Sequence, residues 1–180
     1  MRRERNDPDA RIETQVPSPI MTRVTLREVR DDDLATFFEH QSDPEASRMA
    51  NFPPRDRATF MAHWARILVG SGTERTVEAD GAVAGYIVSW THDDERDVGY
   101  WIGREHWGAG VATAALGAFL TILEERPLFA HVAEHNIGSI RVLEKCGFAL
   151  VDNVALPDEA RNEEGTERLY RLETDSRSAG

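Results

Sequence analysis

The chain has 180 residues, of which 41% are hydrophobic and 29% are charged, and its formal net charge is −11. This length suits one domain with a sizeable core, and the acidic balance argues against nucleic-acid binding, which needs a basic face. The same charge is compatible with a cationic substrate, or with solubility alone. A single cysteine, Cys146, excludes an intrachain disulfide framework. Without an apolar run long enough for a membrane span or a secretory signal, we expect a cytoplasmic protein with no membrane partner.

The N-terminal part of the sequence predicts a flexible leader and then a strand and a helix. Residues 1–20 are polar, carry charges of both signs and contain three prolines, which favours a flexible segment. Residues 24–29 alternate as a half-buried strand does. Apolar residues at helical spacing follow the aspartates 31–33, so we expect a helix whose N-cap is one of these aspartates.

A second helix and a hairpin are predicted next. Residues 60–68 carry apolar side chains at helical spacing, and the glycines after them mark the end of that helix. Residues 44–56, which precede it, have low periodicity and are predicted to form a loop. Two strand-like runs, residues 73–78 and 82–90, flank an Asp-Gly dipeptide that is typical of a hairpin turn.

The C-terminal half alternates strands and helices. Strands at residues 97–102 and 128–132 flank a helix at residues 110–125, which Pro127 is expected to stop. The remaining elements are a helix at residues 136–145, strands at 148–151 and 168–172, and a polar tail at 174–180. Hairpins combined with alternating helices imply one domain, residues 21–173, with a mixed sheet and helices on both faces, in the α+β or α/β sandwich class.

The most informative segment joins the strand at residues 97–102 to the helix that follows it. The segment reads Trp-Gly-Ala-Gly-Val-Ala-Thr over residues 107–113, so two glycines and small residues open directly into an Ala-rich helix. A helix N-terminus has unpaired backbone N–H groups and partial positive charge, and glycines allow a close backbone approach. The segment therefore predicts a binding site for a phosphate or pyrophosphate group.

The runs "VGYWIGREH" and "WGAGVATAAL", followed about 25 residues later by "NIGSIRVLEKCGF", resemble the GNAT superfamily of acetyl-coenzyme A-dependent N-acetyltransferases. More narrowly, they resemble the branch that includes the ribosomal-protein alanine N-acetyltransferases. The resemblance covers roughly residues 24–172. It implies a mixed, mostly antiparallel sheet of about seven strands flanked by about four helices. It also implies that two central parallel strands, residues 98–102 and 128–132, splay apart.

The same resemblance implies acetyl-coenzyme A as the co-substrate. Its pantetheine arm would lie between the splayed strands, and an amide near Trp101 or Ile102 would polarise the thioester carbonyl. Asn136 and Ser139 match the helix that borders the coenzyme, although Asn136 could instead only cap that helix. The predicted cofactor-binding residues are Trp101, Ile102, Trp107, Gly108, Ala109, Gly110, Val111, Ala112, Thr113, Asn136 and Ser139.

Acetyl transfer to an amine needs a neutral amine, a polarised carbonyl and a leaving thiolate. For the base we favour Asp97, because it begins the strand beside the thioester and because burial there would raise its pKa. Glu95 is a weaker candidate, since its turn position predicts exposure. His92 and His106 titrate in a useful range but are expected at the surface.

The general acid is less well defined. Many members of the family use a tyrosine at the position that Leu143 occupies here. Ser139 is the available hydroxyl nearby and is predicted to be catalytic, while Tyr86, Tyr100 and Tyr170 stay open. Cys146 looks like a small buried hydrophobe, so we expect direct attack in a ternary complex rather than a covalent acetyl-enzyme.

The acceptor site is expected as a cleft beside the strands that carry Trp90 and Trp101. Phe52 lies in the segment that forms one wall of this site in the family, and His131 or His135 could line the cleft. The four tryptophans are read as packing residues, of which Trp90 and Trp101 could also shape the acceptor pocket. Histidine spacing gives no metal site, and we expect no metal cofactor.

Two functions of different classes remain. The leading hypothesis is an enzyme that acetylates a primary amine, either a protein N-terminus or a small molecule. The alternative is a non-catalytic acyl-coenzyme A sensor or scaffold, motivated by the missing motif tyrosine. Either would exist as a monomer or a homodimer.

Overall fold

The computed structural model describes residues 22–155 and 166–173, with the side chains of residues 152–155 excepted. The expected leader, residues 1–20, and the expected tail, residues 174–180, lie outside this part of the chain. The strands are β1 (Val24–Arg27), β2 (Thr73–Ala79), β3 (Ala82–His92), β4 (Glu95–Ile102), β5 (Leu128–Ala133), β6 (Ala149–Ala155) and β7 (Thr166–Leu172). The α-helices are α1 (Asp33–Ser42), α2 (Pro44–Ala50), α3 (Arg57–Val69), α4 (Val111–Leu120) and α5 (Ile137–Lys145).

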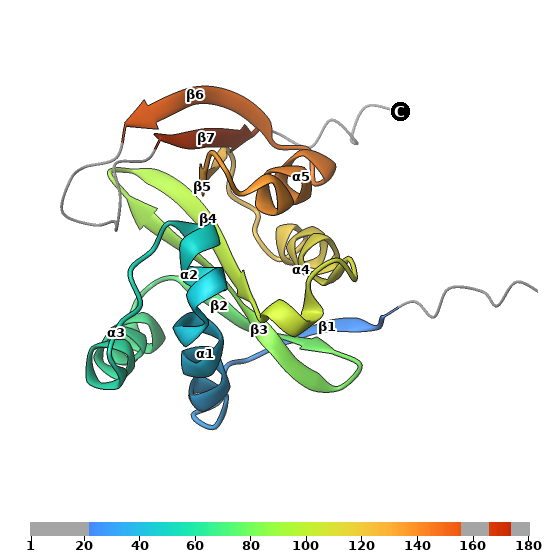
Figure 1. Cartoon of the computed structure of the whole chain (residues 1–180). Coiled ribbons are helices and arrows are strands. Elements are labelled where there is room, and N and C mark those ends of the chain that lie inside the picture. Colours follow the sequence, from blue (N-terminus) through green and yellow to red (C-terminus); the bar gives the residue numbers. More distant parts are fainter. Residues whose placement is uncertain (1–21, 156–165, 174–180) are drawn as a thin grey trace, which may run out of the picture.

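The strands form one seven-stranded sheet in the order β1-β2-β3-β4-β5-β7-β6. Every neighbouring pair is antiparallel except β4 and β5, which are parallel. Helices α1, α2 and α3 lie on one side of the sheet and α4 and α5 on the other (Figure 1). The expected class, a mixed and mostly antiparallel sheet between two helical layers, is confirmed.

Each helical layer has its own apolar cluster. The larger one joins α4 and α5 to the sheet and includes Leu116, Phe119 and Tyr170, all of them buried. The smaller one lies under α1 and α3 and is aromatic, with Phe37 and Trp64 at its centre. None of the helices over residues 22–155 and 166–173 is long and apolar enough to cross a bilayer.

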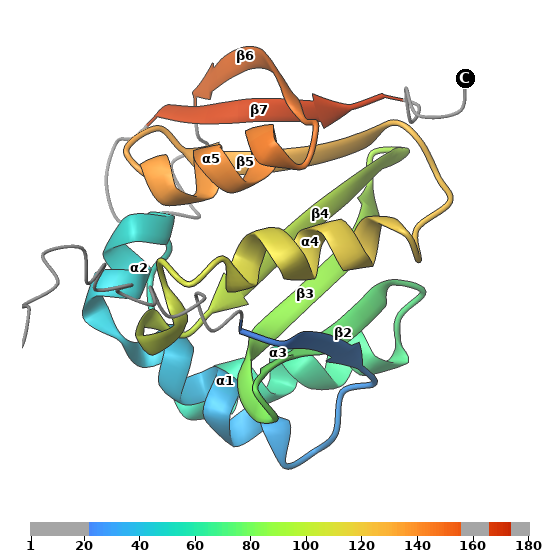
Figure 2. The ribbon, with the colours of Figure 1, turned by 90° about the vertical axis from the view of Figure 1, so that its right-hand side faces the viewer.

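The two parallel strands separate soon after they meet. β4 and β5 pair only at Arg96 with Leu128 and at Asp97 with Phe129. Beyond these pairs the strands diverge, and α2 lies beside the end at which they are far apart (Figure 2). The expected splay is therefore confirmed. In the described structure, the edge of β4 that faces β5 has no strand partner from residue 98 onward.

The segment predicted to be a loop, residues 44–56, contains the helix α2, so that prediction is wrong. Asp43 caps α2 with its side chain, which accepts hydrogen bonds from the amides of Glu45 and Ala46. Pro44 begins the helix, and Asn51 ends it in a left-handed conformation. Two good caps stabilise a helix of 7 residues that is too short to show periodicity.

The helix predicted over residues 110–125 ends earlier, at Leu120. The hydroxyl of Thr121 donates to the carbonyl of Ala118, and the guanidinium of Arg126 donates to the carbonyls of Leu120 and Leu123. Side chains thus satisfy carbonyls that another helical turn would have paired.

An aspartate stands at the N-cap of α1, as expected. Asp32 stands at the N-cap but makes no side-chain hydrogen bond there. Asp33 is buried and accepts hydrogen bonds from Arg27, Thr76 and the amide of Arg30. Burial alone would raise the pKa of Asp33, but these hydrogen bonds outweigh it and lower the pKa to about 2. This carboxylate therefore ties α1 to β1 and β2.

Candidate active site

The loop between β4 and α4 presents a row of unpaired backbone donors. Gly108 and Gly110 both have positive φ, at 75° and 77°, which turns the chain sharply into α4. The amides of residues 108–113 make no backbone hydrogen bond in the described structure, and the amide of Ala114 is the first to do so, with the carbonyl of Gly110. Unpaired donors and the positive end of a helix coincide here, as the sequence predicts.

Trp107 differs from the prediction in two ways. Its amide donates to the carbonyl of Arg104, so the row of unpaired amides begins at Gly108 rather than at Trp107. Its indole N–H donates to the carbonyl of Ile102 at 2.8 Å, and the residue is 42% exposed. A Trp that bonds the end of β4 in this way fixes the loop against the strand, instead of packing in the core. Trp90 is likewise exposed, whereas Trp64 is a core residue.

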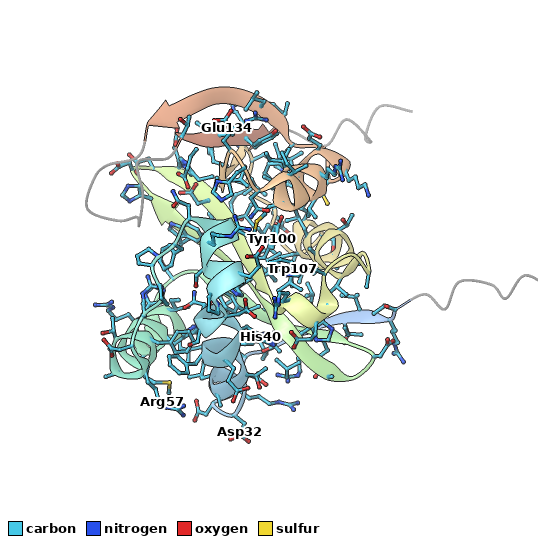
Figure 3. All side chains as sticks on the ribbon, in the orientation of Figure 1. Asp32, His40, Arg57, Tyr100, Trp107 and Glu134 are labelled. Atoms are coloured by element: carbon cyan, nitrogen blue, oxygen red, sulfur yellow. The ribbon has the colours of Figure 1, made fainter. Side chains whose placement is uncertain are left out.

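A cavity of about 390 Å³ lies between α2, α4, α5 and the free edge of β4. All of the predicted cofactor-binding residues except Ala109 line it. Figure 3 shows Tyr100 and Trp107 near the middle of the molecule, where these elements converge. The fold therefore brings together residues from β4, the glycine loop and α5 that are far apart in the sequence.

Two cationic side chains that were not predicted from the sequence also line the cavity. Arg141 and Lys145 line it from α5. They are four residues apart and so lie on one helix face. This spacing was the available signal, but a polar face on an amphipathic helix is ordinarily only solvated. Beside unpaired amides, the two side chains make the cavity suited to a diphosphate.

Ser139 and Tyr100 form a hydroxyl pair on the wall of this cavity. The Tyr100 hydroxyl lies 2.6 Å from Ser139 Oγ. Burial raises the pKa of Tyr100 to about 12, so its hydroxyl stays protonated at neutral pH. Leu143, at the position of the usual motif tyrosine, is buried in the core. A tyrosine hydroxyl is thus present beside Ser139, but it comes from β4 instead of α5.

Asn136 caps α5. Its Oδ1 accepts a hydrogen bond from the amide of Ser139 at 3.0 Å, which leaves the side-chain NH₂ as a spare donor at the cavity wall. The capping interpretation is confirmed, and the binding role stays a prediction.

Asp97 lies in β4 where that strand leaves β5. It is 6% exposed, and its Oδ1 has no hydrogen-bond partner. His131 Nε2 on β5 is 3.8 Å from this oxygen, and His131 Nδ1 is 3.5 Å from Glu167 Oε2 on β7. Burial raises the pKa of Asp97, which the nearby His131 partly opposes. The line of three titratable groups across β4, β5 and β7 was not predicted, because Glu167 is distant in sequence and lacks a motif.

A second cavity, of about 590 Å³, lies on the other side of β4. Phe52 and Trp90, both predicted to contact substrate, line it, whereas His131 does not. Tyr100 and Trp101 line both cavities. β4 is therefore a common wall between a cavity beside the glycine loop and a cavity beneath α3.

The remaining candidate residues lie at positions that do not favour a catalytic role. Glu95 and His92 are exposed at the β3–β4 turn. His135 Nε2 lies 2.9 Å from the carbonyl of Arg48 and so links the start of α5 to α2. Burial raises the pKa of Cys146, the opposite of what a reactive thiolate needs. Within residues 22–155 and 166–173, no three His, Cys, Asp or Glu side chains group as metal ligands.

Comparisons with known proteins agree with this geometry. A family model described as "Acetyltransferase (GNAT) domain" matches residues 23–149. A curated relative, "Uncharacterized N-acetyltransferase p20" of Bacillus licheniformis, is 26% identical over 142 residues, covering 70% of this chain and 79% of the relative.

Solved structures share the fold. One is a spermidine N-acetyltransferase from Vibrio cholerae in complex with CoA and spermine, with a TM-score of 0.72 at 18% identity, over 83% of this chain and 95% of that one. Another is Mycobacterium smegmatis RimJ in complex with CoA-disulfide, with a TM-score of 0.67 at 22% identity, over 84% and 82%. With its family match over most of the chain, this protein belongs to the GNAT acetyltransferase family.

Proposed function

We propose that this enzyme transfers the acetyl group of acetyl-coenzyme A to a primary amine by direct attack in a ternary complex. The observation that carries the proposal is the pair of cavities on opposite sides of β4, which share Tyr100 and Trp101. Their common wall lies where β4 has left β5, so the two reactants can meet through the opening. Coenzyme and acceptor bound together need no covalent acetyl-enzyme.

The first cavity supplies the coenzyme site. The unpaired amides of residues 108–113, together with Arg141 and Lys145, would hold the diphosphate. The free edge of β4 would pair with the amides of the pantetheine arm, as an added strand does. An amide near Trp101 or Ile102 would then polarise the thioester carbonyl.

Asp97 is the proposed base. In the proposed step the amine nitrogen attacks the thioester carbonyl carbon, the new C–N bond forms, and the C–S bond breaks. Asp97, which is buried and lines neither of the two cavities, takes the proton from the amine through one water, and His131 lies 3.8 Å from the carboxylate. Burial favours this role, because a raised pKa makes Asp97 a stronger base than an exposed aspartate.

Tyr100 and Ser139 are the proposed source of the proton for the departing thiolate. Their hydroxyls, 2.6 Å apart, lie at the cavity beside the strand that faces the thioester. This pair provides an acid despite Leu143 at the usual tyrosine position. Tyr100 is protonated at neutral pH and therefore carries a proton to give.

The test is an acetyl-transfer assay on the purified protein with acetyl-coenzyme A and a panel of amines. The panel contains amino acids, polyamines, an aminoglycoside and peptides with free N-termini. We expect a product 42 Da heavier than one of the amines, a thiol released in equal amount, and intersecting initial-velocity lines. Coenzyme binding by calorimetry without turnover on any amine would instead favour a sensor, and parallel lines with a trapped acetyl-enzyme would exclude direct attack.

A further inference from the structure

The second cavity is basic, in a chain whose net charge is −11. Arg55, His63 and Arg66 line it, and Glu74 is its one acidic lining residue. In such an acidic chain, two arginines against one carboxylate at a cavity are a local reversal of charge. The proposed function uses none of these four side chains.

The three basic residues are held on one side of the cavity. His63 and Arg66 are three residues apart on α3 and so share a face of that helix. Arg55 precedes α3, and its guanidinium lies 4.5 Å from the centroid of the Phe52 ring. In the described part of the chain, none of the three forms an ion pair with an acidic side chain.

These charges act on one another. Burial lowers the pKa of Arg55, and the neighbouring Arg66 lowers it further. Burial also lowers the pKa of His63, to which both arginines contribute. Glu74, the acidic residue of this cavity, forms no ion pair with these side chains in the described part of the chain, so the two arginines repel each other and favour a bound anion.

A neutral donor faces the same cavity. The Tyr86 hydroxyl accepts a hydrogen bond from Gln41 Nε2 at 2.8 Å, so its own hydrogen is left to donate. Tyr86 and Gln41 both line the cavity. Arg55 is near enough to influence the pKa of Tyr86, which places the guanidinium and the hydroxyl in one neighbourhood.

We propose that this basic side of the second cavity binds an anionic group of the acceptor, so that the acceptor is a small amine carrying a carboxylate or a phosphonate. The inference rests on the proposed acetyl transfer. Arg55 and Arg66 would pair with the anion, because guanidinium binds carboxylate and phosphonate oxygens through two parallel hydrogen bonds. The amino group would point toward Gly99 and Trp101, which line the cavity at β4. A polyamine would instead place further cations against these arginines.

The first test compares acceptors of matched shape. The twenty L-amino acids, their C-terminal amides and 2-aminoethylphosphonate are assayed beside putrescine and spermidine. We expect at least one anionic amine to be acetylated with a kcat/KM about 10- to 100-fold above that of its amide, which lacks the anionic group. This is the range of one charge-assisted hydrogen bond. The rates for the amino acids, compared with the rate for 2-aminoethylphosphonate, show whether the site prefers a carboxylate or a phosphonate. A preference for the polyamines, or equal rates for an acid and its amide, would overturn the proposal.

The second test is mutational. Arg55→Gln and Arg66→Gln should each raise KM for the anionic amine about 10- to 100-fold, with coenzyme affinity unchanged. Neither change should raise KM for the corresponding amide, which lacks the anionic group. Arg57→Gln is the matched control. Arg57, labelled in Figure 3, also lies on α3, but it does not line the cavity. Unchanged KM in both cavity variants would contradict the anion site. Arg66 is exposed, so its variant is expected to fold even if that of Arg55 does not.

The two proposals fail differently. If no amine on the panel is acetylated, the proposed function fails, and the anion site is then read from calorimetry on the coenzyme-loaded protein. Binding of 2-aminoethylphosphonate or an amino acid that weakens in Arg66→Gln would still support the site. Absence of binding by every anionic amine would overturn it.

Discussion

At the scale of single residues, Asp97 is the proposed base, and the fold brings other titratable groups near it. The presence of Asp97 in a strand could be predicted from the sequence, although β4 begins earlier than predicted, at Glu95. Its surroundings could not, because His131 on β5 lies beside Asp97 and Glu167 on β7 lies beside His131, 34 and 70 residues further along the chain than Asp97. Sequence proximity predicts contacts within an element, and a sheet brings distant elements together.

Asp97→Asn should lower kcat by about 100-fold or more, the usual contribution of a general base, and leave coenzyme affinity within about 2-fold of wild type. Because burial raises the pKa of Asp97, wild-type activity should fall with decreasing pH at a higher pH than an ordinary aspartate would give. The asparagine variant should lose that acidic limb. The measurements are pH–rate profiles and calorimetric titration of coenzyme A.

The same variant separates a catalytic role from a structural one. When the folded-state pKa of a carboxyl is raised, stability falls as pH rises from the unfolded-state pKa through the folded-state pKa. Wild type carries this penalty at neutral pH, and the asparagine does not. The melting temperature of Asp97→Asn should therefore be equal to or above that of wild type. A large drop in melting temperature would indicate that Asp97 mainly holds the fold.

At the scale of elements, the loop and the start of α4 are the part of the site that the sequence predicts best. Glycines, small residues and a helix start are local signals, and the structure places unpaired amides at residues 108–113. The sequence could not predict α2 or its position, because a short capped helix has no period. It also could not reveal that α2 contributes Ala46, Met49 and Ala50 to the first cavity.

Gly110→Asp should weaken coenzyme binding by about 100-fold or more, because its carboxylate would stand where the diphosphate is proposed to bind and would repel it. Gly117→Asp is the control. Gly117 is an exposed position of α4, and a Cβ there meets no atom within 4 Å. Both affinities are measured by calorimetry. Equal affinity of the two variants for the coenzyme would contradict the proposal that the diphosphate binds at this loop.

The start of α5 allows a test of whether Asn136 does more than cap its helix. Asn136→Asp keeps the oxygen that accepts from the Ser139 amide, and a negative charge is favourable at a helix N-terminus. Stability to urea should therefore be retained. Coenzyme affinity should fall about 10-fold, because the variant lacks the NH₂ donor and adds a repulsive charge. Asn136→Ser, which caps without the charge, should also bind more weakly; wild-type affinity in both variants would leave Asn136 as a cap alone.

At the scale of the whole molecule, net charge is a poor guide to the site. A charge of −11 is compatible with a cationic substrate, yet the second cavity presents Arg55, His63 and Arg66. Charge summed over a chain ignores which side chains face a cavity. The fold class could be predicted from the order of strands, helices and glycines, since those signals are local and repeated. The charge of a pocket could not, because it depends on which faces of α3 and β3 meet.

The wall of β4 that the two cavities share also has a consequence for inhibitor design. A single molecule that joined coenzyme A to an acceptor would reach both sides of β4 through the gap left by β5. Once one half had bound, the other would be confined at an effective concentration in the millimolar range. Such a tethered compound would gain affinity from geometry alone, without any contact that the separate halves lack.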